Sequence, residues 1–113
     1  MQHDDLILVE DILVEVRDAL EFTLGYDRDR FVADRRTRKA VVHSIQTIGE
    51  AALHLSDEFI AAHPSVPWGQ IVGMRHRLVH GYRGVSYDIV WAVVEDELPG
   101  LEVALAPLLD EGV

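Results

Sequence analysis

The chain has 113 residues, a formal net charge of −10 and no cysteine, and 49% of its residues are hydrophobic. This length and composition predict one folded domain, residues 1–113, and exclude a disordered chain, disulfides and thiolate metal sites. The N-terminus lacks a basic signal-peptide start, and no apolar run approaches about 18 residues. We therefore expect a soluble, cytoplasmic protein without a membrane segment.

The distribution of charge limits where an anionic ligand could bind. The net charge excludes a general nucleic-acid binder, because non-specific affinity comes from Lys and Arg that neutralise phosphates. Six of the ten basic residues lie between positions 28 and 39, and three more lie between 75 and 83. From Ser86 onward there are seven acidic residues and no basic ones. A local positive site stays open, whereas a broad basic surface is excluded.

Apolar residues at steps of three and four predict two helices in the first half of the chain. The first covers residues 4 to 24, with acidic residues at its positive start and Gly25 at its end. The second begins between Arg28 and Asp34 and ends by His63, because Pro64 cannot continue it. The apolar positions are Leu6, Val9, Leu13, Val16 and Leu20 in the first helix, and Val41, Ile45, Ile48, Ala52, Leu55 and Phe59 in the second.

The second half of the chain predicts two more helices. Pro67 begins a short third helix that ends near His80, and Ser86 caps a fourth helix. Pro99 and Gly100 interrupt the apolar pattern of the fourth helix, so we expect a kink or break there. Trp68 and Trp91 are expected in the core or at an interface. Together the elements predict an all-α antiparallel bundle of four to five helices.

The candidate chemistry lies at the end of the third helix. Arg75 can hold a phosphate through parallel hydrogen bonds, and His80 can exchange a proton near neutral pH, a pairing suited to phosphodiester cleavage. The alternative is a solvated helix end whose basic residues match the macrodipole. On an ideal helix the two side chains point about 140° apart. They share a pocket only if the helix unwinds at Gly81 or if a second chain completes the pocket.

Other polar residues allow further interpretations. His76 and His80 share a helical face and suggest a metal site, but no neighbouring segment offers an obvious third ligand. On the second helix His43, Thr47, Glu50 and His54 form a polar line, and we expect His43 and His54 to be solvated. A mid-helix glycine usually allows another helix to approach closely, so Glu50, next to Gly49, is a candidate to hold Arg75 or a catalytic histidine.

The chain resembles the HepT-like toxins of the HEPN superfamily. These toxins carry an arginine, four residues, a histidine, one residue and a tyrosine, and Arg75, His80 and Tyr82 match this motif. Relatives commonly have asparagine after the arginine, where this chain has His76, which is also polar. The resemblance covers nearly the whole chain through Phe31–Asp34, Ile48–Ala51, His63–Trp68, Gly73–Arg75, Leu78–Tyr82 and Val90–Trp91.

The resemblance implies a HEPN-like helical bundle that forms a homodimer, with the active site in a cleft between the protomers. It implies a metal-independent endoribonuclease without a cofactor, acting as the toxin of a type VII toxin–antitoxin pair. The implied partner is a minimal nucleotidyltransferase that inactivates the toxin by attaching AMP to the motif tyrosine, here Tyr82. The implied substrate is RNA, and neither DNA nor a membrane is an expected partner.

The implied chemistry assigns a role to each candidate residue. His80 would accept the proton of an RNA 2′-OH, and Arg75 would stabilise the charge that grows on the phosphoryl oxygens. The need for a 2′-OH explains a preference for RNA over DNA. His76 and Glu50 are the expected supporting residues around this pair. Arg77 and Arg83 are the expected RNA contacts.

A second hypothesis is a non-catalytic helical dimer that binds nucleotide or the transferase without cutting RNA. The basic residues between Arg28 and Lys39 would then pair with an acidic face of the partner protein. A nuclease assay that compares the wild type with His80→Ala separates the two hypotheses.

Overall fold

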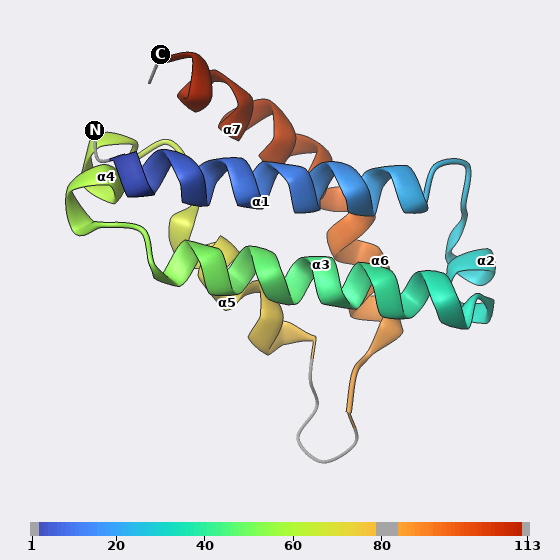
Figure 1. The fold of residues 1–113 in the computed structure, drawn as a ribbon. Helices are drawn as coiled ribbons and strands as arrows, with labels where there is room; N and C mark the ends of the chain where they lie inside the picture. The colour runs from blue at the N-terminus through green and yellow to red at the C-terminus, as the bar shows by residue number, and fades with distance from the viewer. Residues whose placement is uncertain (1–2, 79–83, 112–113) are drawn as a thin grey trace.

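The computed structural model describes residues 3–78 and 84–111, and this part of the chain is almost entirely helical (Figure 1). The all-α bundle expected from the sequence is therefore confirmed, and no described helix is long and apolar enough to cross a membrane. The described helices are α1 (His3–Phe22), α2 (Arg28–Ala33), α3 (Arg35–Leu53), α4 (Asp57–Ala62), α5 (Trp68–Arg77), α6 (Tyr87–Asp96) and α7 (Leu98–Glu111).

Helix α3 lies at the centre of the bundle. It runs antiparallel to α1 beside it, and it also packs against α5 and α6, while α7 packs against α1 (Figure 1). Ile45 and Ile48 of α3 are fully buried, as their apolar spacing predicts. Trp68 and Trp91 are also buried, so their expected place in the core is confirmed. Because α3 is fixed on several sides, its remaining exposed face is held in a defined orientation.

The second helix expected from the sequence begins within its predicted limits, because α3 starts with Asp34 as its N-cap. Its expected end by His63 is wrong, because α3 ends at Leu53 and a separate helix, α4, follows. The residues before Asp34 form another short helix, α2. The first break is at Asp34, whose backbone is extended (φ −98°, ψ 94°). Its carboxylate accepts hydrogen bonds from the Tyr26 hydroxyl at 2.6 Å and from the Thr37 amide at 3.1 Å. A side chain that caps the next helix in this way competes with continuation of the preceding one.

The second break lies before Ser56, which caps α4 by accepting a hydrogen bond from the Phe59 amide at 3.1 Å. Ser56 also donates from its amide (2.8 Å) and its hydroxyl (2.7 Å) to the carboxylate of Asp5, which is 2% exposed. These bonds satisfy a buried charge and fix the start of α4 on α1.

The break expected near Pro99 is present, two residues earlier, at Glu97 between α6 and α7. Pro99 therefore lies in the first turn of α7, where its missing N–H removes no helical hydrogen bond.

Candidate active site

Arg75 lies in the last turn of α5, and its side chain crosses α3 at Gly49. A Cβ atom placed on Gly49 would lie 3.2 Å from Cδ and 3.3 Å from Cγ of Arg75. Both distances are shorter than an ordinary van der Waals contact, so the Arg75 side chain can follow this path because residue 49 has no side chain. The close approach expected at Gly49 is present, and the helix that approaches is α5 of the same chain.

Glu50 holds the end of the Arg75 side chain. Nη1 of Arg75 donates to Oε2 of Glu50 at 2.5 Å, and the other carboxylate oxygen lies 3.4 Å from Nε2 of His54 (i, i+4). The hydrogen bond from Arg75, followed by that from His54, lowers the pKa of Glu50 below its ordinary value. The contact between Glu50 and Arg75 that the sequence suggested is therefore present, and Glu50 is ionised at neutral pH. No described residue bonds Nη2 or Nε of Arg75.

Arg75 and His76 both line an open groove with a volume of about 1060 Å³ between α1, α3 and α5. Asp11, Glu15 and Glu50 also line it, whereas Arg75 is the one guanidinium among its described lining residues. Phosphate would therefore be repelled along much of the groove and attracted at Arg75. The remaining lining residues are Leu8, Val14, His43, Gln46, Thr47 and Ala51.

The polar line expected on the second helix lies on α3. His43 and His54 are exposed, as expected, and His43 and Thr47 line the groove while His54 contacts Glu50. The sequence interpretation overlooked Gln46, which is also exposed toward the groove. Its spacing from His43 and Glu50, three and four residues, was the available signal.

Arg77 points about 160° away from Arg75 around α5. Its two terminal nitrogens donate to the two carboxylate oxygens of Glu97 at 2.9 and 2.8 Å, which raises the pKa of Arg77. Gln70 also donates to Glu97 at 2.9 Å. Arg77 therefore fastens α5 to the junction of α6 and α7, and its guanidinium does not line the groove.

The other motif residues, His80 and Tyr82, and the expected RNA contact Arg83 lie outside the described residues. The described residues on either side of this segment are close together. The Ser86 amide donates to the carbonyl oxygen of Leu78 at 2.7 Å, next to the end of α5. Leu78 and Ser86, which this bond joins, therefore both lie beside the end of the helix that carries Arg75.

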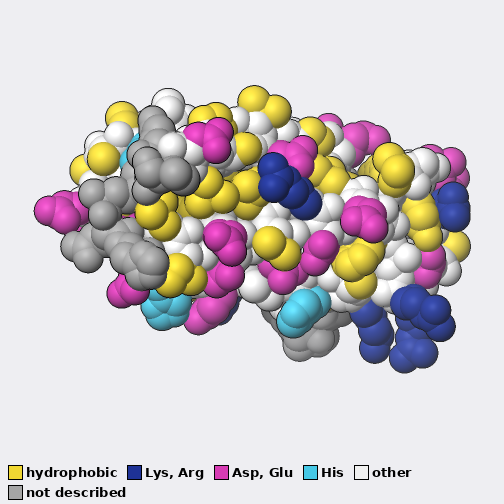
Figure 2. All heavy atoms as spheres, turned by 45° about the horizontal axis from the view of Figure 1, so that its top comes forward, with side chains coloured by type: hydrophobic (Ala, Val, Ile, Leu, Met, Phe, Trp, Pro, Cys, Tyr) yellow, Lys and Arg dark blue, Asp and Glu magenta, His cyan; other side chains and the backbone are white. Residues whose placement is uncertain are grey.

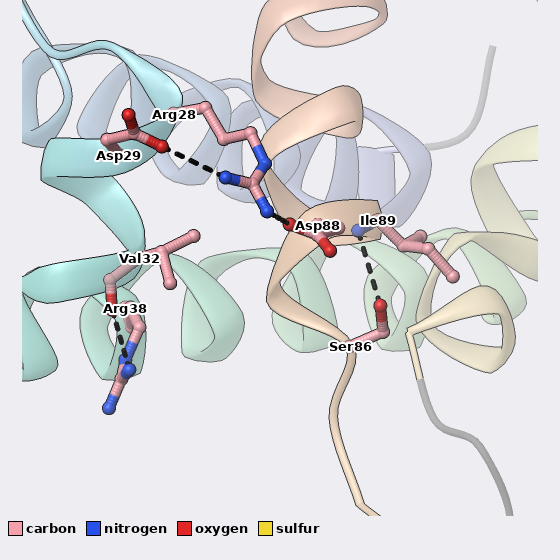
Figure 3. Close-up of polar contacts among 7 residues, drawn as sticks. All are labelled: Arg28, Asp29, Val32, Arg38, Ser86, Asp88 and Ile89. Carbon is pink, nitrogen blue, oxygen red and sulfur yellow. Dashed lines mark hydrogen bonds and ion pairs between the residues drawn. The ribbon is translucent and has the colours of Figure 1, made fainter.

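The start of α6 is fixed by α2 (Figure 3). The Ser86 hydroxyl accepts a hydrogen bond from the Ile89 amide at 3.5 Å, and Arg28 pairs with Asp88 in the first turn of α6 at 2.5 Å. The hydrogen bond that Arg28 donates to Asp88 is the largest cause of the raised pKa of Arg28. Arg38 donates to the carbonyl oxygen of Val32 at 2.7 Å and lies 4.4 Å from the Tyr87 ring centre.

Of the two histidines that suggested a metal site, His76 lines the groove and His80 lies outside the described residues. In residues 3–78 and 84–111 no group of three His, Cys, Asp or Glu side chains is arranged to hold a metal ion.

The family model and the related proteins that match this chain are all described as ribonucleases. The family model described as HepT-like, Ribonuclease HepT-like, matches residues 12–108. A Caldanaerobacter subterraneus protein named as an RNase is 39% identical over 103 residues, covering 91% of this chain and 92% of its own. A Methanocaldococcus jannaschii protein named as an RNase is 39% identical over 89 residues (79% and 74%), and a Thermococcus cleftensis protein named as a probable ribonuclease HepT is 33% identical over 100 residues (88% and 89%). No solved structure matches the chain significantly.

Proposed function

Because the chain belongs to the HepT-like ribonuclease family and is thus an endoribonuclease, we propose that it cleaves RNA without a metal ion at the groove beside Arg75. The observation that carries the proposal is the guanidinium of Arg75. Gly49 and Glu50 hold it at the edge of the groove, five residues before His80. Glu50 occupies one nitrogen and no described residue bonds Nη2 or Nε, which leaves these two to bind a phosphate.

In the proposed reaction, His80 accepts the proton of the 2′-OH next to the scissile phosphate. The 2′ oxygen bonds to phosphorus, the bond to the 5′ oxygen breaks, and the proton passes to this leaving oxygen. The products are a 2′,3′-cyclic phosphate and a 5′-hydroxyl. Arg75 stabilises the negative charge on the phosphoryl oxygens, and Glu50 keeps Arg75 in place before RNA binds.

His76 and the arginines have different proposed roles. His76 lines the groove next to Arg75 and would contact the bound RNA as a polar group. Arg83 would contact a neighbouring phosphate. Arg77 would reach RNA only if phosphate replaced Glu97 as its partner.

We assign the active site to a homodimer, as the family resemblance implies. The groove also exposes apolar side chains that a second chain would cover, among them Val14, which is 50% exposed. In this arrangement the partner completes the site around each Arg75.

We further propose that the protein is the cytoplasmic toxin of a toxin–antitoxin pair and that a minimal nucleotidyltransferase silences it by attaching AMP to Tyr82. The added phosphate would lie two residues from His80 and would compete with the substrate phosphate for Arg75. Mass spectrometry after incubation with the cognate transferase and ATP should find AMP mass on the peptide that contains Tyr82. The mass should be absent from Tyr82→Phe, and AMP on another residue would contradict the proposal.

The activity itself is tested by incubating purified protein with RNA in EDTA and analysing the product ends. We expect cleavage that leaves 2′,3′-cyclic phosphate ends. The substitution His80→Ala should abolish this cleavage. Loss of cleavage in EDTA with recovery on adding zinc or manganese would contradict the metal-independent mechanism. Absence of cleavage by the wild type, with nucleotide or transferase binding retained, would favour the non-catalytic dimer.

A further inference from the structure

The described cations fall into two groups according to their partners. Four arginines are each paired with a carboxylate: Arg17 with Glu102 (3.0 Å), Arg28 with Asp88 (2.5 Å), Arg75 with Glu50 (2.5 Å) and Arg77 with Glu97 (2.8 Å). The described cations without an ion-paired carboxylate are Arg30, Arg35, Arg36, Arg38 and Lys39. Among the described residues, positive charge without a paired carboxylate is therefore concentrated where α2 meets α3.

Four of these five cations are exposed, and we call them the basic corner: Arg30, Arg35, Arg36 and Lys39. Figure 2 shows most of the visible Lys and Arg side chains gathered at one end of the molecule and another near the middle of this face, while Asp and Glu side chains are spread over the whole face. In a chain with a net charge of −10, this corner is a local site of attraction for anions.

The basic corner does not stabilise α3. Arg35 and Arg36 lie in the first turn of this helix, which contains no acidic residue. Positive charge at the N-terminus of a helix opposes the macrodipole. The nearby carboxylate of Asp34 is already occupied by Tyr26 and Thr37.

A strip of α3 connects the basic corner to the groove. The steps from Lys39 to His43, Gln46 and Glu50 are four, three and four residues, so these exposed side chains lie within about 60° of one another around the helix. No acidic residue occurs on α3 before Glu50, and Glu50 is paired with Arg75. An anionic strand on this strip would meet no unpaired carboxylate of α3 between the corner and Arg75, and the carboxylates of Asp11 and Glu15 that line the same groove come from α1.

We propose that the basic corner and this strip of α3 bind the single-stranded RNA that continues from the cleavage site. The proposal rests on the proposed function. RNA fits better than an acidic protein because the strip leads directly to Arg75, and because arginine binds phosphate through parallel hydrogen bonds. Arg36 and Glu50 are 14 positions apart, which is about 21 Å along the helix. A stacked strand rises about 3.4 Å per nucleotide, so the distance corresponds to about six nucleotides.

Fluorescence anisotropy of labelled RNA tests the proposal directly, with His80→Ala as the background so that the RNA stays intact. The test variant carries Arg35→Gln, Arg36→Gln and Lys39→Gln, and the control carries Arg17→Gln, which removes a cation on α1. The probes are a single strand of about 20 nucleotides and one of about three, which is too short to span the strip at about 3.4 Å per nucleotide.

We expect the triple variant to bind the long RNA on the order of tenfold more weakly at about 0.1 M salt. Its log–log salt dependence should be shallower by about 2, because each lost contact with a single strand contributes about 0.7. Affinity for the short RNA should not change, and Arg17→Gln should bind both RNAs like the background. A thermal melt no lower than that of the background would show that the triple variant is folded, since the removed charges oppose the dipole of α3.

Equal affinity and equal salt dependence of the triple variant and the background would overturn the proposal. Binding of polyglutamate but not RNA would also overturn it and would assign the corner to an acidic protein. If the proposed function is wrong but this proposal is right, the basic corner would still bind the long RNA, whereas the wild type would cleave no RNA.

Discussion

At position 49 the absence of one methyl group determines how closely Arg75 can cross α3. The Arg75 side chain runs directly over Gly49, and the next residue, Glu50, holds its guanidinium. Two adjacent residues of α3 therefore fix both the path and the end of the proposed catalytic arginine.

Gly49→Ala should separate stability from activity. Alanine favours the helix by about 1 kcal/mol over glycine, but its methyl group displaces the stem of Arg75. We expect a folded protein whose kcat for RNA cleavage falls on the order of tenfold, because a small displacement of a catalytic group is costly. Cleavage kinetics and a thermal melt measure the two effects.

Gly69→Ala is the matched control, because an added Cβ at Gly69 meets no atom within 4 Å. It should retain wild-type kcat. Wild-type kcat in Gly49→Ala as well would show that Arg75 does not need this path.

Part of the site could be predicted from the sequence. A mid-helix glycine followed by glutamate suggested a close helix approach and a partner for Arg75, and both are present. The groove could not be predicted, because it depends on how α1 lies against α3 and α5. The ion pair between Arg77 and Glu97 also depends on packing, since the two residues are 20 positions apart in the sequence.

At the scale of helices, polar caps determine where the elements end. Apolar periodicity located the helical segments, but it did not show the separate helix α2 before Asp34 or the break before Ser56. The bond between Ser56 and Asp5 joins residues 51 positions apart, so no local pattern reveals it. The cap at Asp34 had a local signal, since serine, threonine, asparagine or aspartate often precedes a helix, but the Tyr26 contact that strengthens it is tertiary.

Asp34 should make stability depend on pH in the acidic range. Hydrogen bonds from Tyr26 and Thr37 lower its pKa in the folded protein to about 2, below the ordinary value of 3.8. The folded pKa is the lower one, so the stabilisation is complete above about pH 4 and is lost as the pH falls towards 2.

Urea unfolding at pH 7 and at acidic pH tests this prediction. Asp34→Ala should lower stability at pH 7, whereas Asp34→Asn should keep most of it because asparagine is an equally good cap. Asp34→Asn should also lose less stability than the wild type as the pH falls from 4 to 2. Identical pH profiles for the wild type and Asp34→Asn would be evidence against a charged cap.

At the scale of the whole molecule, charge separation restricts where RNA can lie. Twenty acidic residues repel phosphate from most of the surface, and the described cations without ion pairs lie at one corner. The groove itself is lined by three carboxylates and exposes Val14 and Leu8 beside them. This mixture suits a surface that a second copy covers in part.

The protein should sediment as a homodimer at micromolar concentration. Dimer formation would cover the apolar side chains of the groove and would bring a second chain to each Arg75. A charged substitution in the groove, Val14→Glu, should weaken the dimer and reduce cleavage together. A monomer that retains full activity would contradict the composite site.

Single-turnover cleavage in EDTA measures whether Arg75 in this groove takes part in metal-independent RNA cleavage. Wild type, Arg75→Ala and the control Arg17→Ala should be compared on one RNA at saturating protein. We predict that Arg75→Ala slows cleavage on the order of 10²- to 10³-fold, as expected for loss of a group that stabilises transition-state charge, and that Arg17→Ala cleaves like the wild type. Cleavage by Arg75→Ala at the wild-type rate would show that Arg75 has no catalytic role.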